Sequence, residues 1–268
     1  MEIIYSERKP PWFVKEEYRK VNRTKSSVLI VGAGQETSEV RFMYPDFIPY
    51  THEGKGSLLY NQVTDNEHTF KIGGLELEYI REDSNSAWRN CRSAELALGK
   101  WFIEKFENNA LEIGDVTCHY SFFKEHLIVD PFGPYEKSIR ESAELVDYTN
   151  LNVLSISTLE HLNNTEYENN DPNLGTKVLQ KIHKEAKNYL ITIPVGGWRP
   201  LEDFLMRQND IKYTFLQRNN YRSETNNWTN KNDKDLFYEN YLHFEYHLDY
   251  YGCAAVVCVV SNLKEIYQ

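Results

Sequence analysis

Short, uninterrupted apolar runs separated by helical patterns constrain this chain more than any other feature of its sequence. The runs VLSIS, LITI and AAVVCVV begin at Val153, Leu190 and Ala254. Because apolar residues occupy consecutive positions, these runs indicate strands that are covered on both faces. Helical spacing of apolar residues lies between the runs and before them, at 86–106 and 175–188. Strands that alternate with helices predict an α/β sheet of the doubly wound kind.

The pattern before residue 86 is different. The segments SSVLIVGAG and EVRFMY indicate strands, and HTFKIGGLELEYIRE indicates a hairpin that turns at Gly73 and Gly74. We therefore expect two parts, a β-rich N-terminal element over 1–85 and an α/β domain over 86–268.

Composition and charge narrow the possible partners. The chain has 268 residues and a net charge of −10. Proteins that bind nucleic acid through its phosphates usually expose a basic surface, so we expect no nucleic-acid partner. The start of the chain lacks the apolar core of a secretory leader, and no apolar run is long enough to span a membrane. The four cysteines lack the close spacing of a zinc site and indicate a reducing compartment, so we expect a cytoplasmic protein. The sequence does not indicate its oligomeric state.

Two glycine turns follow apolar runs, one at Gly32-Ala33-Gly34 and one at Gly114. Such a turn indicates a nucleotide site when the next strand ends in an acidic residue that can accept ribose hydroxyls. No such strand follows Gly34, whereas the run HLIVD after Gly114 ends at Asp130. We expect the second turn to bind a ligand and the first to be structural, although the first could still approach a ligand in the folded protein.

The motifs ALEIG, LIVD, VLSISTLEHL and LITIPVG together resemble the core of class I S-adenosylmethionine-dependent methyltransferases. More narrowly, SISTLEH and TIPVG are similar to motifs of bacterial and viral methyltransferase-like proteins associated with polysaccharide synthesis. The resemblance extends from Ala87 to the C-terminus, and the turn EIGDVTCHY departs from it by having a single glycine. It implies a Rossmann-like sheet of seven strands, mostly parallel, with the last strand, CAAVVCVV, antiparallel.

The resemblance also implies which residues hold S-adenosylmethionine. It places Glu112 and Gly114 along the cofactor, Asp130 at the ribose, Asp147 of AELVDY at the adenine, Ser155 and Ser157 beside the methyl group, and Arg92 at the carboxylate. Each residue has a structural alternative. The carboxylates can be solvated or belong to ordinary turns, the arginine can lie on a solvated helix face, and the hydroxyls can bond to the backbone.

Glu160 and His161 follow the VLSIS run, where the methyl acceptor must approach. Transfer to a hydroxyl needs a base, and the ordinary pKa of histidine suits His161 to that task. Glu160 could orient the histidine or bind a divalent metal, which is possible but not indicated, and both residues could instead be structural. A further possible metal pair, His243 and His247, has no third ligand in view.

We therefore predict O-methylation of a saccharide or glycan hydroxyl in polysaccharide biosynthesis. The region after TIPVG is rich in Trp, Tyr, Arg and Asn, which can stack on sugars and hydrogen-bond to them. Two alternatives stay open. One is a glycan transferase that uses a sugar nucleotide on a similar sheet, and the other is a non-catalytic cofactor-binding or scaffold protein of the same fold, which the single-glycine turn favours.

Overall fold

The computed structural model describes residues 68–82, 84, 87, 90–162, 171–218, 227–238, 254 and 256–268. They belong to one compact unit that runs from Asp65 to Gln268. The predicted strands SSVLIVGAG and EVRFMY, the turn at Gly32-Ala33-Gly34 and the pair His243 and His247 lie outside the described residues. No helix in the described part of the chain combines the length and apolarity needed to cross a membrane.

The described strands alternate with α-helices only in part, since no described α-helix separates β3, β4 and β5 or β7, β8 and β9. The described elements are β1 (Thr69–Ile72), β2 (Leu75–Glu78), α3 (Arg92–Phe106), β3 (Ala110–Ile113), β4 (Leu127–Val129), β5 (Asn152–Ile156), α4 (Leu174–Glu185), β6 (Asn188–Pro194), α5 (Arg199–Arg207), β7 (Tyr213–Arg218), β8 (Trp228–Lys231) and β9 (Val256–Ser261), with short 3₁₀ helices η3 (Glu107–Asn109), η4 (Thr117–His119) and η6 (Lys264–Ile266). Strands β1 and β2 form the predicted antiparallel hairpin, in which Ile72 is paired with Leu75.

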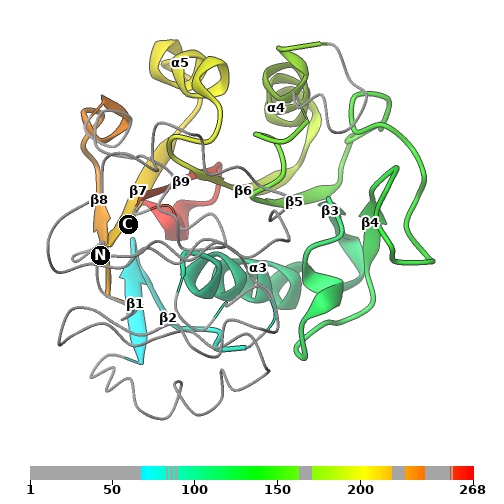
Figure 1. The fold of residues 1–268 in the computed structure, drawn as a ribbon, viewed down its shortest axis with the longest axis horizontal. Coiled ribbons are helices and arrows are strands. Elements are labelled where there is room, and N and C mark those ends of the chain that lie inside the picture. The colour runs from blue at the N-terminus through cyan, green and yellow to red at the C-terminus, as the bar shows by residue number, and fades with distance from the viewer. Residues whose placement is uncertain are drawn as a thin grey trace, which may run out of the picture. The chain divides into compact units, whose positions relative to one another are not determined.

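The main sheet has seven strands in the order β4-β3-β5-β6-β9-β7-β8 (Figure 1). Strand β3 pairs in parallel with β4 and β5, and β5 with β6. Strand β9 pairs antiparallel with both β6 and β7, which confirms its predicted direction. The Rossmann-like α/β sheet of seven strands is thus confirmed.

The prediction of a mostly parallel sheet with one antiparallel strand is wrong. Strand β8 also runs antiparallel to its neighbour β7, with Arg218 opposite Trp228. Three of the six pairings in this sheet are therefore antiparallel, and the sheet is mixed. Strand β8 escaped prediction because its sequence WTNK has one buried apolar residue and forms no apolar run.

Both faces of the sheet are covered, as the apolar runs predict. In β9, Val257 and Val259 belong to a core that includes the apolar side of α3. The alternate residues Val256, Cys258 and Val260 belong to a second core, with side chains of α4 and α5. Figure 1 shows α3 on one side of the sheet and α4 and α5 on the other. Consecutive apolar residues of β9 are buried because a helix layer covers the sheet on either side of this strand.

Strand β4 lies at one end of the sheet and is only three residues long. Its outer side is met by the segment around Ile139, which forms a parallel bridge with Val129. The amide of Ile139 donates to the carbonyl of Ile128 at 2.8 Å, and the amide of Asp130 donates to the carbonyl of Ile139 at 3.1 Å. The outer carbonyl of Ile128 and the amide of Asp130, just after β4, are therefore paired although β4 lies at the end of the sheet.

Candidate functional site

The carboxyl ends of β3, β4 and β5 meet at one edge of the sheet because the three strands are parallel neighbours. The chain leaves β3 toward β4 on one side, and later enters β5 on the other side of β3. Ligands of open α/β sheets bind at such a reversal of strand order, in the crevice outside the carboxyl ends. A ligand site is therefore expected at the loops after β3, β4 and β5 (Figure 1).

Gly114 ends β3 in a conformation that favours glycine, with φ of +83°. Its amide donates to the carbonyl of Val129 at 2.9 Å. A Cβ at this position would lie 2.4 Å from Oγ1 of Thr158 and 2.8 Å from its Cγ2. The residue is glycine because the loop after β5 packs directly against it. This close packing brings the loops after β3 and β5 together.

Asp130 follows β4, as predicted, and its half-buried carboxylate organises the neighbouring loops. One oxygen accepts from the amides of Phe132 at 2.8 Å and Gly133 at 2.6 Å. The other accepts from the amide of Asp115 at 3.1 Å. A carboxylate offers about four acceptor positions, so about one position stays available for a ligand hydroxyl.

Glu112 holds the loop after β3 by accepting hydrogen bonds from Thr117. Its side chain is fully buried, and one oxygen accepts from the amide of Thr117 at 3.0 Å. The other accepts from the hydroxyl of Thr117 and lies 3.0 Å from Nε2 of the buried His126. Burial alone would lower the pKa of His126, but the hydrogen bond and charge of Glu112 raise it. Both carboxylate oxygens of Glu112 thus have partners within the protein, which disfavours its predicted contact with a cofactor.

A buried polar network lies at the carboxyl ends of β5 and β6. Glu95 of α3 is fully buried, and its Oε1 accepts from the hydroxyls of Ser157 and, at 2.8 Å, Thr192. Nη1 of Arg92 lies 3.7 Å from Oε2 of Glu95 and donates to the carbonyl of Ile156 at 3.5 Å. Arg92 and Ser157, two of the predicted site residues, thus both contact Glu95, which the sequence reasoning did not single out.

Ser157 follows β5 with φ of +43°, a strained conformation for a residue other than glycine. Its amide donates to the carbonyl of Thr192 at 3.0 Å, so the neighbouring strand β6 holds the backbone in place. Positive φ values in such residues concentrate where the backbone is held for binding or catalysis. The loop that starts at Ser157 carries Glu160 and His161.

Glu160 is a buried carboxylate whose burial outweighs the opposing charge of Arg92. It is 5% exposed, and among the described residues neither oxygen has a hydrogen-bond partner. Burial raises the pKa of Glu160 to about 8, and the charges of Glu95 and Glu202 add to the rise. Nε2 of His161 lies 3.8 Å from Oε1 of Glu160, and the imidazole is 45% exposed. A proton-holding buried acid therefore adjoins an accessible imidazole.

Glu202 of α5 is a further buried carboxylate at this edge. Its Oε1 accepts from the amide of Gly196 at 2.6 Å, and its Oε2 lies 3.7 Å from Nη1 of Arg199. Burial raises the pKa of Glu202. Sequence reasoning missed Glu95 and Glu202 because both lie in helices, where an acidic residue is ordinarily solvated. An acidic residue on the apolar side of the helical pattern was the feature that could have revealed Glu95.

The predicted residues Ser155 and Asp147 differ in position. Ser155 lies opposite Ile113 near the carboxyl end of β5, and within the described part of the chain its buried hydroxyl has no hydrogen-bond partner. Asp147 is exposed and accepts from the amide of Thr149 at 2.9 Å. The predicted strand AELVDY is a turn followed by an irregular segment that enters β5 at its amino end. Asp147 is therefore at the opposite edge of the sheet from Gly114, and we leave it out of the candidate site.

Comparison with known proteins shows fold likeness alone. No protein-family model matches this chain, and no curated protein matches it in sequence. A SAM dependent methyltransferase from Archaeoglobus fulgidus is similar in structure, with 14% identity and a TM-score of 0.34 over 63% of this chain and 95% of that one. A chain of the Pnkp1/Rnl/Hen1 RNA repair complex is similar at 11% identity and a TM-score of 0.33, over 77% of this chain and 46% of that one. At these scores the likeness is weak.

Proposed function

We propose that this chain is an S-adenosylmethionine-dependent methyltransferase that acts on a saccharide hydroxyl. One observation carries the proposal. The reversal of strand order at β3 gathers a glycine turn, a strand-end aspartate and a loop with a buried acid beside an accessible histidine. Together with the motif resemblance, this arrangement supports a cofactor on the Gly114 side and an acceptor on the His161 side.

The residues at this edge fit the parts of such a cofactor. Asp130 keeps about one acceptor position for a ribose hydroxyl. Arg92 stands at the start of the 15-residue helix α3, next to the carboxyl end of β5, and its planar guanidinium suits a carboxylate. S-adenosylmethionine would supply an activated methyl group on a sulfonium. The task of the chain's own residues is then to align the acceptor hydroxyl and take its proton.

The surroundings of Glu160 and His161 suit them to different parts in taking the proton of the acceptor hydroxyl. With a pKa of about 8, Glu160 keeps its proton at neutral pH and cannot serve as the base there. The accessible imidazole of His161 can accept the proton from the acceptor hydroxyl, with Glu160 beside it. We therefore assign His161 as the base and Glu160 as its positioning residue.

Titration of the protein with S-adenosylhomocysteine, the demethylated cofactor, should release or absorb measurable heat in isothermal calorimetry. Asp130→Ala should weaken this binding by roughly 1.5–3 kcal/mol, because a ribose hydroxyl loses a charged acceptor. Asp147→Ala is the matched control, since that aspartate lies at the opposite edge and its loss should leave the dissociation constant unchanged.

Because Asp130 also holds the loops after β3 and β4, each variant needs a circular dichroism spectrum that shows it is folded. An absence of heat with folded wild-type protein would refute the cofactor assignment. Equal affinity in wild type and Asp130→Ala would remove Asp130 from the site, and weaker binding in Asp147→Ala would restore its predicted adenine contact. Heat with a sugar nucleotide but none with the cofactor product would favour the glycan transferase.

His161→Ala should lower turnover by about 100-fold while leaving cofactor affinity almost unchanged, because a general base acts in the transition state. Single-turnover transfer of a labelled methyl group to a panel of saccharides provides the measurement. A wild-type rate in the variant would make His161 structural. Cofactor binding without transfer to any acceptor would favour the scaffold alternative, and transfer to RNA or protein would overturn the saccharide assignment.

A further inference from the structure

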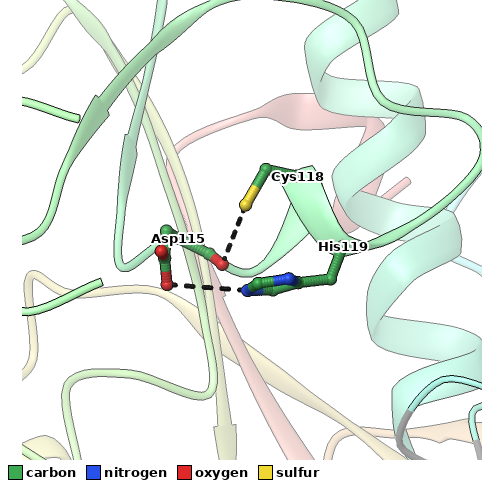
Figure 2. Close-up of side chains that lie close together, drawn as sticks. All are labelled: Asp115, Cys118 and His119. Atoms are coloured by element: carbon green, nitrogen blue, oxygen red, sulfur yellow. Dashed lines mark hydrogen bonds and ion pairs between the residues drawn. The ribbon is translucent and has the colours of Figure 1, made fainter. Parts of the chain in front are cut away.

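The loop after β3 gathers three potential metal ligands that the proposed methyl transfer does not use. Asp115, Cys118 and His119 each offer one donor atom, and the three atoms lie within 4.8 Å of one another. Oδ1 of Asp115 is 3.8 Å from Nε2 of His119, and Figure 2 shows the two groups facing each other with the thiol of Cys118 above them. Tetrahedral zinc with ordinary bond lengths separates its donor atoms by about 3.3–3.8 Å, so small side-chain rotations would suffice.

The backbone that carries these ligands is held from several sides. The buried carboxylate of Glu112 holds the start of η4 through the amide and hydroxyl of Thr117. The amide of Asp115 is held by the carboxylate of Asp130. A metal at this position would therefore meet a loop that is already folded, and would not have to order one.

The aspartate is also oriented by neighbours, as metal ligands usually are. The amide of Tyr135 donates to Oδ2 of Asp115 at 3.1 Å, which leaves Oδ1 directed at His119. A Cβ on Gly133 would lie 2.1 Å from Oδ2, so the chain passes close to this carboxylate at a glycine. Such outer contacts fix the ligand and are a regular part of metal sites.

We propose that Asp115, Cys118 and His119 form a binding site for a zinc ion. A thiolate, an imidazole and a carboxylate suit zinc, whereas magnesium and calcium prefer oxygen donors alone. Three protein ligands leave a coordination position for water or a further ligand. Cys118 and His119 are accessible enough for an ion to reach them. The inference rests on this loop and is independent of the proposed methyl transfer.

Cobalt titration of metal-free, full-length protein tests the proposal. Cobalt replaces zinc in such sites, and a thiolate ligand gives an intense charge-transfer absorption that other ligands do not. We expect one equivalent of cobalt to produce this band and zinc to abolish it by displacement. Cys118→Ser should eliminate the band, and His119→Ala and Asp115→Asn should weaken zinc binding by at least about tenfold, measured by competition with a chromophoric chelator.

Two variants serve as controls. His183→Ala alters a second imidazole–carboxylate pair, in which Nε2 of His183 lies 3.3 Å from Asp210 without a thiol nearby among the described residues, and it should leave the spectrum unchanged. Cys253→Ser, outside the described residues, should also keep the band. No band in folded wild-type protein, a band that survives Cys118→Ser, or a band lost in Cys253→Ser would each overturn the proposal. Calorimetry with S-adenosylhomocysteine on the metal-free protein separates these outcomes from failure of the proposed function.

Discussion

Glu112→Ala should lower the free energy of unfolding by about 3–5 kcal/mol, the range found when one partner of a buried ion pair is removed. The substitution leaves His126 buried without its carboxylate and removes the acceptor for the amide and hydroxyl of Thr117. Denaturant titration followed by circular dichroism measures the change. Glu112→Gln, which keeps an acceptor oxygen, should cost less and provides a folded comparison if the alanine variant does not fold.

The loss should depend on pH through His126. Because Glu112 raises the folded-state pKa of His126 above its ordinary 6.5, the pair stabilises the fold fully below pH 6.5 and less as pH rises through the folded pKa. Glu104→Ala is the matched control, since its carboxylate is 45% exposed and 3.8 Å from Lys124. That change should cost less than about 1 kcal/mol. Equal losses in the two variants would show that Glu112 is not the support of its loop.

Glu160→Gln should stabilise the protein, and increasingly so as pH rises from 4.5 to 8. The ordinary pKa of glutamate is 4.5, and burial raises that of Glu160 to about 8. Between these values the unfolded chain has lost the proton that the folded state keeps, so the stability of the wild type falls as pH rises. Each unit of pKa difference corresponds to about 1.4 kcal/mol, and glutamine escapes the loss because it does not ionise.

Unfolding midpoints of wild type and variant at several pH values between 4.5 and 8 give the comparison. Glu141→Gln, an exposed position, is the control and should show no trend of this kind. A difference between wild type and Glu160→Gln that stays constant over this window would mean that Glu160 titrates near its ordinary pKa. The assignment of His161 rather than Glu160 as the base would then lose its reason.

The strands of the sheet were predictable because consecutive apolar residues need cover on both faces. Strands β5, β6 and β9 contain such runs and all lie in the middle of the sheet. The terminal strand β8 could not be found in this way, since Trp228 is its one apolar residue. The direction of β8 followed from pairing with β7, a long-range property that no local pattern contains.

The site was predictable in position but not in its contacts. Asp130 and Gly114 could be placed because they end adjacent parallel strands. The spacing of acidic residues could not distinguish the half-buried carboxylate of Asp130, which keeps an acceptor position, from the fully buried carboxylate of Glu112, whose oxygens both have partners within the protein. The segment AELVDY that carries Asp147 was predicted to be a strand and is a turn followed by an irregular segment, and the burial of Glu95 depends on the packing of α3 on the sheet.

The segment at Ile139 that covers β4 has a consequence for the protein's behaviour at high concentration. A sheet margin with free amides and carbonyls recruits strands from other molecules and leads to aggregation. At β4 the amide of Ile139 already donates to the carbonyl of Ile128, and the carbonyl of Ile139 already accepts from the amide of Asp130. A second molecule would have to displace this segment before it could add a strand there, so this margin resists intermolecular β-sheet growth.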